Sequence, residues 1–182
     1  DLSNGVTISG NHQSAVFNFL FSNATLRGLT IADSQGSAVE AFVSHLNLED
    51  CILRGNTSPF DGGALVLDDA FNGSASITRC TFDQNSASRD GGAIFNRSIL
   101  NITDSTFTNN HSGGNGGAIV SGIYRVGLRV RNSAFTCNTA DNGGAIAAGS
   151  LQLIHCTIHG NQAATAGGGI LSWLGCHYID LM

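Results

Sequence analysis

The chain has 182 residues, of which 42% are hydrophobic and 12% are charged, so it can bury a sizeable core and is not of disordered composition. All eight basic residues are arginines scattered along the chain, and the formal net charge is −5, which excludes nucleic acid and anionic membranes as main partners. No apolar run reaches the roughly 18 residues that span a bilayer. Gly occurs 24 times and Pro once, which is typical of short strands joined by tight turns.

A six-residue pattern recurs along the chain: a small residue or Cys, any residue, a large apolar residue, two further residues, and then Asn. The first copies are weak, with Ile8 before Asn11 and Ile31 before Ser34. Five clear copies follow, and they end at Asn56, Asn85, Asn110, Asn138 and Asn161. Successive copies are 22 to 29 residues apart, which predicts a repeat architecture.

Each repeat carries two further apolar segments. A pair of apolar residues in alternation, such as Leu100 and Ile102, precedes the six-residue pattern. The sequence Gly-Gly-Ala-aliphatic follows the pattern at 62–65, 91–94, 116–119 and 143–146. At 167–170 Gly takes the place of Ala, and eroded forms of the motif occur at 14–16 and 37–39. Three short strands per repeat, without space for a crossover helix, predict that successive repeats stack directly. The expected fold is all-β: a single-stranded right-handed parallel β-helix, or pectin-lyase-like solenoid, of about seven coils forming one domain over residues 1–182.

Stacking at about 4.8 Å predicts columns of equivalent side chains inside the solenoid. Phe82, Phe107 and Phe135 should form an aromatic stack. The five Asn residues should form a hydrogen-bonded ladder at a bend, where a short amide tolerates unusual backbone angles. The paired glycines suit a turn that requires positive φ or a close approach of backbones.

At this point the motifs resemble a known family. Gly-Gly-Ala-Ile together with Phe-x-x-Asn is similar to the polymorphic outer membrane protein repeats of chlamydial autotransporters and other cell-surface β-helical proteins. The similarity covers residues 46–172 well and the first forty weakly. It implies an extracellular or outer-membrane-associated passenger domain that adheres to host cells. A stacking motif does not specify the ligand of the outer surface.

The cysteines at 51, 80 and 156 share the small inward position with Ser105 and Ser133, so they are expected to be core thiols. A Cys51–Cys80 disulfide is the alternative, because adjacent coils bring the two Cα atoms within reach, although parallel side chains in register rarely offer the required dihedral angle. Cys137 and Cys176 fall outside this column. Strand alternation separates Cys156 from its neighbouring histidines, so no metal site is expected there.

Four polar residues precede the glycine pairs and should align as a ladder of oxygens: Asp61, Asp90, Asn115 and Asn142. Turn chemistry explains such residues at this position. A weak Ca²⁺ contact is the alternative, because two carboxylates about 5 Å apart repel each other unless a cation or a proton intervenes. No other cofactor is expected.

The two longest repeats place their extra residues after the Gly-Gly-Ala-aliphatic strand, over 68–73 and 122–127. These inserts lie two coils apart at the same angular position, so they should protrude side by side about 10 Å apart, with Arg97 and Ser98 as the floor between them. The resulting groove offers carboxylate, guanidinium and aromatic groups for a glycan. The candidate ligand-binding residues are Asp68, Asp69, Phe71, Arg97, Tyr124 and Arg125. The alternative is that they are solvated loop residues.

These features favour a non-catalytic cell-surface or secreted β-helix, acting as an adhesin or a structural module with a host-cell or glycan ligand. A polysaccharide lyase or glycoside hydrolase using the two inserts is the first alternative, although the chain lacks Lys, and Asp68 and Asp69 are adjacent and would point apart. No catalytic residue is assigned. The second alternative is a structural component that self-associates end to end through the open ends of the stack.

The ends of the chain and its glycosylation sequons complete the expectations. Residues 173–182 are expected to form a cap or a truncated coil, and the chain is expected to be a fragment of a longer protein. Among six Asn-x-Ser/Thr sequons, those at Asn56 and Asn110 belong to the predicted ladder and should not be glycosylated, whereas Asn72 on an insert is available in a eukaryotic source.

Overall fold

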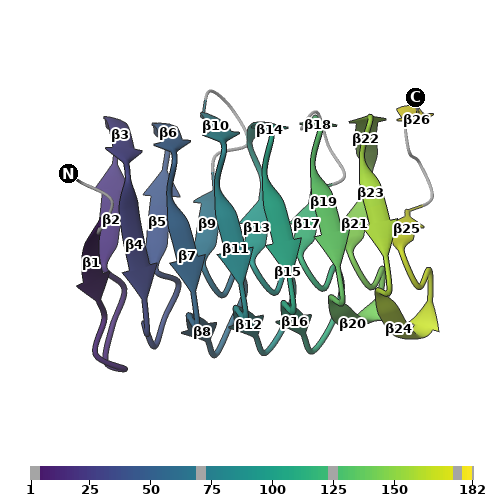
Figure 1. Ribbon diagram of the computed structural model, residues 1–182, viewed down its shortest axis with the longest axis horizontal. Coiled ribbons are helices and arrows are strands. Elements are labelled where there is room, and N and C mark those ends of the chain that lie inside the picture. Colours follow the sequence, from purple (N-terminus) through teal and green to yellow (C-terminus); the bar gives the residue numbers. More distant parts are fainter. Residues whose placement is uncertain (1–4, 69–72, 123–126, 174–177, 182) are drawn as a thin grey trace.

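The structure, a computed structural model, describes residues 5–68, 73–122, 127–173 and 178–181. These residues form a right-handed, single-stranded parallel β-helix in which every strand pairs in parallel with its counterparts in the adjacent coils (Figure 1). No helix occurs among the described residues. The predicted fold class is confirmed.

Four parallel sheets, here called A, B, C and D, line the solenoid. Between residues 45 and 172 each coil passes through them in the order C, A, D, B, whereas the described part of the earlier coils has no strand in sheet D. Sheet C contains β3 (Asn23–Arg27), β6 (His45–Glu49), β10 (Ser74–Thr78), β14 (Ile99–Thr103), β18 (Leu128–Arg131), β22 (Ser150–Ile154) and β26 (Tyr178–Leu181). Sheet A contains β1 (Val6–Ser9), β4 (Leu29–Ala32), β7 (Ile52–Arg54), β11 (Thr81–Asp83), β15 (Thr106–Thr108), β19 (Ala134–Thr136) and β23 (Thr157–His159).

The other two sheets follow in each coil. Sheet D contains β8 (Thr57–Ser58), β12 (Ser86–Ala87), β16 (His111–Ser112), β20 (Thr139–Asn142) and β24 (Gln162–Ala166). Sheet B contains β2 (Phe17–Leu20), β5 (Val39–Phe42), β9 (Leu65–Asp68), β13 (Ile94–Asn96), β17 (Ile119–Ser121), β21 (Ile146–Ala148) and β25 (Ile170–Ser172).

Sheets C, A and B, of seven strands each, correspond to the three strands expected in each repeat. Sheet D is an addition that the sequence did not predict. Three of its five strands have only two residues, which is too short for any alternation of polar and apolar side chains to be visible. Residues 178–181 pair with β22 and so extend sheet C by one further strand.

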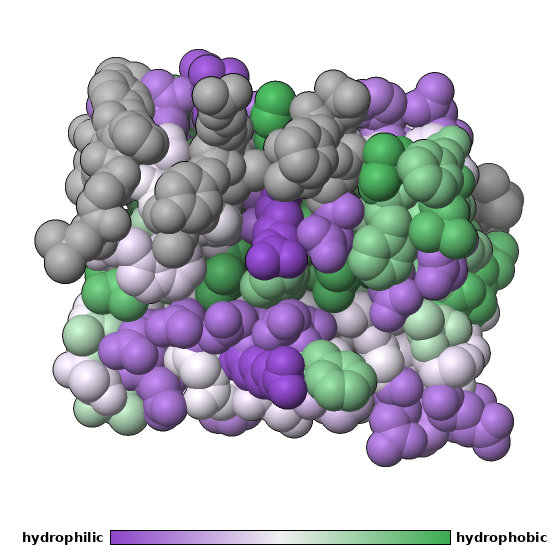
Figure 2. Space-filling model, turned by 180° about the vertical axis from the view of Figure 1, so that it is seen from behind, coloured by the Kyte–Doolittle hydropathy of each residue, from purple (hydrophilic) through white to green (hydrophobic). Residues whose placement is uncertain are grey.

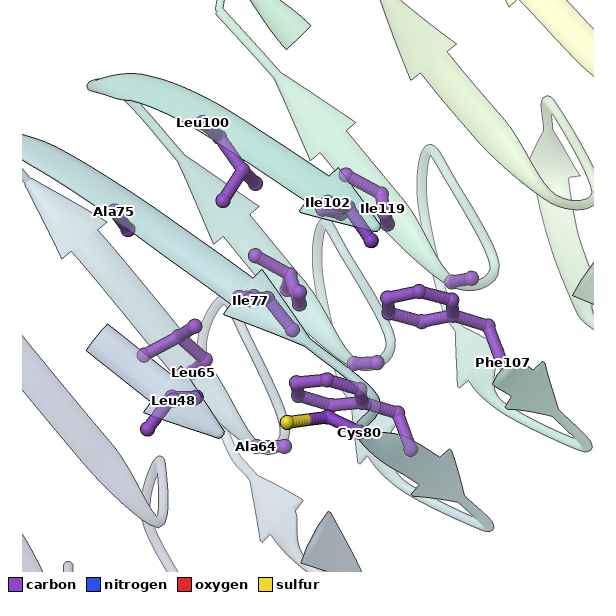
Figure 3. Packing of buried hydrophobic residues seen from close by; sticks show 14 of the residues in the cluster. Leu48, Ala64, Leu65, Ala75, Ile77, Cys80, Leu100, Ile102, Phe107 and Ile119 are labelled. Carbon is purple, nitrogen blue, oxygen red and sulfur yellow. The ribbon is translucent and has the colours of Figure 1, made fainter. Parts of the chain in front are cut away.

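The interior is built from columns of equivalent side chains. The rings of Phe82, Phe107 and Phe135 are fully buried and nearly parallel, with successive centroids 4.8 Å apart, which confirms the aromatic stack. Aliphatic side chains of sheets B and C surround this stack, and Figure 3 shows Leu65 and Ile102 directed with Phe107 into the same interior. Burial of these columns is the main force that holds the coils together.

The Asn ladder is also confirmed. In Asn56, Asn85, Asn110 and Asn138 the side-chain Nδ2 donates to Oδ1 of the ladder Asn in the next coil, over 2.8 to 3.0 Å. The same Oδ1 accepts the backbone N–H of the preceding ladder residue, as Asn110 Oδ1 does from Asn85 N at 3.0 Å. The ladder side chains from Asn56 to Asn138 are fully buried, which also removes the sequons at Asn56 and Asn110 from solvent.

One detail of the ladder differs from expectation. The unusual backbone angle belongs to the residue before each Asn, and φ lies between 54° and 65° at Gly55, Gln84, Asn109, Cys137 and Gly160. A left-handed residue at this point reverses the direction of the next side chain. The Asn amide can therefore point inward at the corner.

The two glycines of each pair have separate roles. The first has positive φ, for example 67° at Gly91. The second is a point of close approach, because a Cβ on Gly92 would overlap the carbonyl oxygen of Gly117 in the next coil. Both roles had been expected for the pair as a whole, and the structure divides them between its members.

The cysteines of the inward column are free thiols. Cys51 and Cys80 are buried, and Cys156 is partly buried. The thiol of Cys80 donates to Thr78 O at 3.3 Å, just as Ser105 Oγ donates to Thr103 O at 2.8 Å. Because both side chains make the same hydrogen bond, either Ser or Cys can occupy this position. The hydrogen bond with Cys51, together with burial, raises the pKa of Cys80 and keeps it protonated. Cys137 is exposed, and Cys176 lies outside the described residues.

Candidate functional site

A groove of about 440 Å³ runs over the outer face of sheet B. Figure 2, which views the molecule from the side opposite to Figure 1, looks onto this face, where hydrophilic and hydrophobic side chains are intermixed. Its floor comes from β5, β9 and β13, and one wall is the corner that links β8 to β9. The side chains that give it chemical character are those of Glu40, Phe60, Asp61, Asp68, Phe95 and Arg97.

Strand alternation explains how these residues reach the surface. Val39, Leu65 and Ile94 form one column of sheet B and are fully buried. The next residue of each strand points the other way, so Glu40, Val66 and Phe95 form an outward column in adjacent coils. The floor of the groove is therefore acidic at one end and aromatic at the other.

The guanidinium of Arg97 lies between the carboxylate of Asp68 and the ring of Phe95. Its Nη1 lies 3.6 Å from Asp68 Oδ1, and its guanidinium carbon lies 5.7 Å from the centre of the Phe95 ring. Both members of the ion pair remain well exposed, so the pair adds little to stability. Its effect is to orient a guanidinium between a carboxylate and an aromatic ring.

The corner that forms the groove wall carries a second aromatic ring. Phe60 is 61% exposed, so its ring is open to a ligand in the groove. The guanidinium carbon of Arg89 lies 5.4 Å from its ring centre. The groove thus presents two phenyl rings, each with an arginine beside it.

Glu40 is the acid with the most distinct environment. Its Oε2 accepts a hydrogen bond of 3.1 Å from Asn18 Nδ2. Burial raises the pKa of its carboxyl, because removal of water disfavours the charged form. Sequence reasoning missed Glu40, although its outward position next to Val39 follows from strand alternation.

The corner under Arg97 depends on Asn96, a second residue that sequence reasoning missed. Its fully buried side chain accepts from Ser98 N at 3.0 Å, and its Nδ2 donates to Ser98 O and Ser121 Oγ. The signal that could have revealed it is an Asn at a position where the preceding coil has Leu67, followed by Ser121 in the next coil. These bonds determine where the chain turns after β13, and so where Arg97 projects.

The structure places only some of the predicted ligand-binding residues. Asp68 and Arg97 meet in the groove, and Ser98 is buried at the corner, so Arg97 alone of the expected floor pair is open to solvent. Asp69, Phe71, Tyr124 and Arg125 lie outside the described residues, as does most of each insert. Phe60 and Phe95 enter the site from elements that had not been considered.

The predicted ladder of oxygens beside the glycine pairs lies next to the groove. Asp61 Oδ1 accepts the backbone N–H of Asp90 at 3.1 Å, and Asp90 Oδ1 accepts from Asn115 N and Nδ2 at 2.8 and 2.9 Å. These bonds correspond to the turn chemistry expected for this position. Within the described ranges, no three His, Cys, Asp or Glu side chains gather as ligands for a metal ion.

His155 and His159 are exposed, whereas Cys156 is partly buried and its thiol hydrogen-bonds to Ile154 O. The three side chains are therefore not directed to one point, as strand alternation predicts.

In the part of the chain that the structure describes, no helix has the length and apolar character needed to cross a membrane.

The comparisons with known proteins address the family. No match was found among curated proteins or among solved structures. A family model described as "Right handed beta helix region" matches residues 3–181. Since this match spans nearly the whole chain and coincides with four stacked parallel sheets, the chain belongs to the right-handed β-helix family.

Proposed function

We propose that the chain is a non-catalytic binding module of a secreted or cell-surface protein, and that the groove on sheet B holds a glycan. The observation that carries this proposal is the combination of Phe60, Phe95, Arg97 and Glu40 around one open groove of about 440 Å³. Concave sites with apolar surface and a few convergent polar groups are the usual form of small-ligand sites in proteins.

The groove offers what a sugar ring requires. Phe60 provides an exposed ring against which the C–H face of a sugar can pack, and Phe95 provides a half-buried one. The Arg97 guanidinium donates hydrogen bonds and the Glu40 carboxylate accepts them, so hydroxyl groups of a ligand find partners of both kinds. The similarity of the repeat motifs to cell-surface β-helices supports the adhesin or passenger role and the extracellular location.

The acids of the groove favour binding over catalysis. Asp68 is held by Arg97, and Asp61 Oδ1 is occupied by the backbone N–H of Asp90. Glycoside hydrolysis by two carboxylic acids requires one protonated acid and a second, available carboxylate on the other side of the bond. Burial raises the pKa of Glu40, as a general acid requires, but both aspartates already have a partner.

One observation favours a glycoside hydrolase as the second candidate. Glu40 has the raised pKa that a general acid needs, and Asp68 lies in the adjacent strand two positions further on. Strand geometry places the two Cα atoms about 8 Å apart, within the range from which a pair of carboxyl groups can flank a glycosidic bond. In this alternative Asp68 would have to leave Arg97 when substrate binds.

A polysaccharide screen separates the two candidates. The protein is incubated with immobilised neutral and acidic polysaccharides, with and without Ca²⁺, and both retention and release of reducing ends are measured. We expect retention of at least one polysaccharide without release of reducing ends. Phe95→Ala and Arg97→Ala should weaken retention, whereas Arg54→Ala, an exposed arginine on sheet A, should not.

Two results would contradict the proposal. Turnover that disappears in Glu40→Gln would replace the binding module with the hydrolase. Retention that is unaffected by Phe95→Ala and Arg97→Ala would show that the groove is not the binding site.

A further inference from the structure

A second hollow lies on the outer face of sheet C, on a different side of the solenoid from the groove. It has a volume of about 260 Å³ and is formed by β14, β18 and β22, which are adjacent at the top of Figure 1. The side chains and backbone that give it shape and chemistry are those of Ile99, Asn101, Gly127, Arg129, Ser150 and Gln152.

The hollow exists because one outward side chain is missing. Leu100, Leu128 and Leu151 are paired in register and buried, so the residues just before them form a column on the outer face. That column reads Ile99, Gly127, Ser150. A Cβ built on Gly127 meets no atom within 4 Å, and Gly127 O still accepts Leu100 N at 3.0 Å, so the backbone is in place and only the side chain is absent.

Polar side chains lie along one side of this hollow. Asn101, Arg129 and Gln152 are the next outward column, again in register. Gln152 Nε2 donates to Asp180 Oδ2 at 3.1 Å, which holds this amide at the rim. Ile99, with 50% of its surface exposed, supplies an apolar wall beside these polar groups.

Arg129, like Arg54 and Arg131, has no ion-pair partner among the residues that the structure describes, but it alone of these three lines the hollow. Arg27 pairs with Glu49, Arg79 with Asp50 and Arg97 with Asp68. The exposed guanidinium of Arg129 forms no ion pair or hydrogen bond with any residue that the structure describes. A free guanidinium at a hollow with amide and hydroxyl groups is suited to an anion.

We propose that this hollow binds a single carboxylate that has an aliphatic group beside it, such as an N-acylated amino acid or the C-terminus of a peptide. The planar guanidinium of Arg129 matches a carboxylate in two parallel hydrogen bonds and balances one negative charge. The amides of Asn101 and Gln152 and the hydroxyl of Ser150 bond the polar atoms next to it. The aliphatic group packs on Ile99 above Gly127.

The test uses N-acetyl-leucine as the probe and N-acetyl-leucinamide as its uncharged counterpart, with binding followed by NMR shifts of backbone amides. We expect the acid to shift the Gly127 and Arg129 amides in a saturable manner and the amide to bind at least about tenfold more weakly, because charge-assisted hydrogen bonds are lost. A tripeptide ending in Leu, and its C-terminal amide, determine whether a peptide terminus or only the small acid is accepted.

Matched variants locate the site. Arg129→Ala should weaken binding at least about tenfold, whereas Arg131→Ala, two residues along the same strand face and outside the hollow, should leave it unchanged. Gly127→Leu should abolish binding without loss of folded structure, because its side chain fills open space. Equal binding of acid and amide, equal effects of the two arginine variants, or no saturable shifts would each overturn the proposal.

Discussion

Replacement of Asn110 by Ala tests whether the amide ladder stabilises the stack. The Asn110 side chain is fully buried and takes part in four hydrogen bonds. It donates to Asn138 Oδ1 at 2.9 Å and to Phe82 O at 3.1 Å, and it accepts from Asn85 Nδ2 and Asn85 N at 3.0 Å each.

The magnitude follows from this set of bonds. A buried hydrogen bond contributes a net of about 1 kcal/mol, so four of them amount to about 4 kcal/mol. Two partners keep another bond: Asn85 Nδ2 still donates to Leu53 O, and Asn138 Oδ1 still accepts from the backbone N of residue 110. We therefore expect a loss of about 3 to 4 kcal/mol, a large part of the 5–15 kcal/mol that is typical of folded domains.

Urea denaturation followed by far-ultraviolet circular dichroism measures this loss. Asn47→Ala, on the exposed face of β6, is the matched control and should change the free energy of unfolding by less than about 0.5 kcal/mol. Asn110→Asp should cost at least as much as Asn110→Ala, since it removes both donors and buries a carboxylate. A loss below about 1 kcal/mol for Asn110→Ala would refute the reasoning that the ladder is a source of stability.

Three further perturbations test the core, the glycine corner and the acid of the groove. Phe107→Ala removes the central ring of the stack and should lower the free energy of unfolding by about 3 to 5 kcal/mol, as measured by urea denaturation. Gly117→Ala should prevent folding or greatly reduce the melting temperature, because its Cβ would overlap backbone atoms of Gly144 and Thr139, whereas Gly127→Ala should fold normally; similar melting temperatures would contradict the role of close approach. Since burial raises the pKa of Glu40, the folded chain binds more protons than the unfolded chain above the usual value of 4.5, so stability should fall as pH rises from there. Glu40→Gln should remove that part of the slope, and urea midpoints over a pH series that are identical to those of the parent would contradict the assignment.

Much of the fold could be predicted because a stacked repeat turns local pattern into tertiary contact. When each coil lies directly on the last, a Phe at one position of the repeat meets the Phe of the next coil, and an Asn meets an Asn. The aromatic stack and the amide ladder were therefore visible in the sequence. Sheet D was not, because strands of two residues such as Ser86–Ala87 have no periodicity.

The candidate site was less predictable. The insert that begins at Asp68 follows the Gly-Gly-Ala-aliphatic strand, and this position in the repeat indicated that Asp68 would lie beside Arg97 of the next coil. Phe60 comes from the corner after sheet D, and its approach to the outer face of sheet B depends on how sharply that corner bends. The sequence pattern of a single repeat does not predict how sharply this corner bends.

The sequence by itself determined the repeat, the parallel stacking, and the inward columns of Phe, aliphatic and Asn residues, since each follows from hydrophobic periodicity and a stacking offset of one coil. Only the tertiary structure decided which outward residues meet. Glu40 and Phe95 lie two strands apart on sheet B, and Ile99 and Arg129 lie on neighbouring strands of sheet C. On these outer faces no burial requirement selects the side chain, and the residue type varies from coil to coil. The physical reason is that the core repeats its contacts in every coil, whereas a groove or hollow arises where a single coil departs from the repeat, as at Gly127 and Asn96.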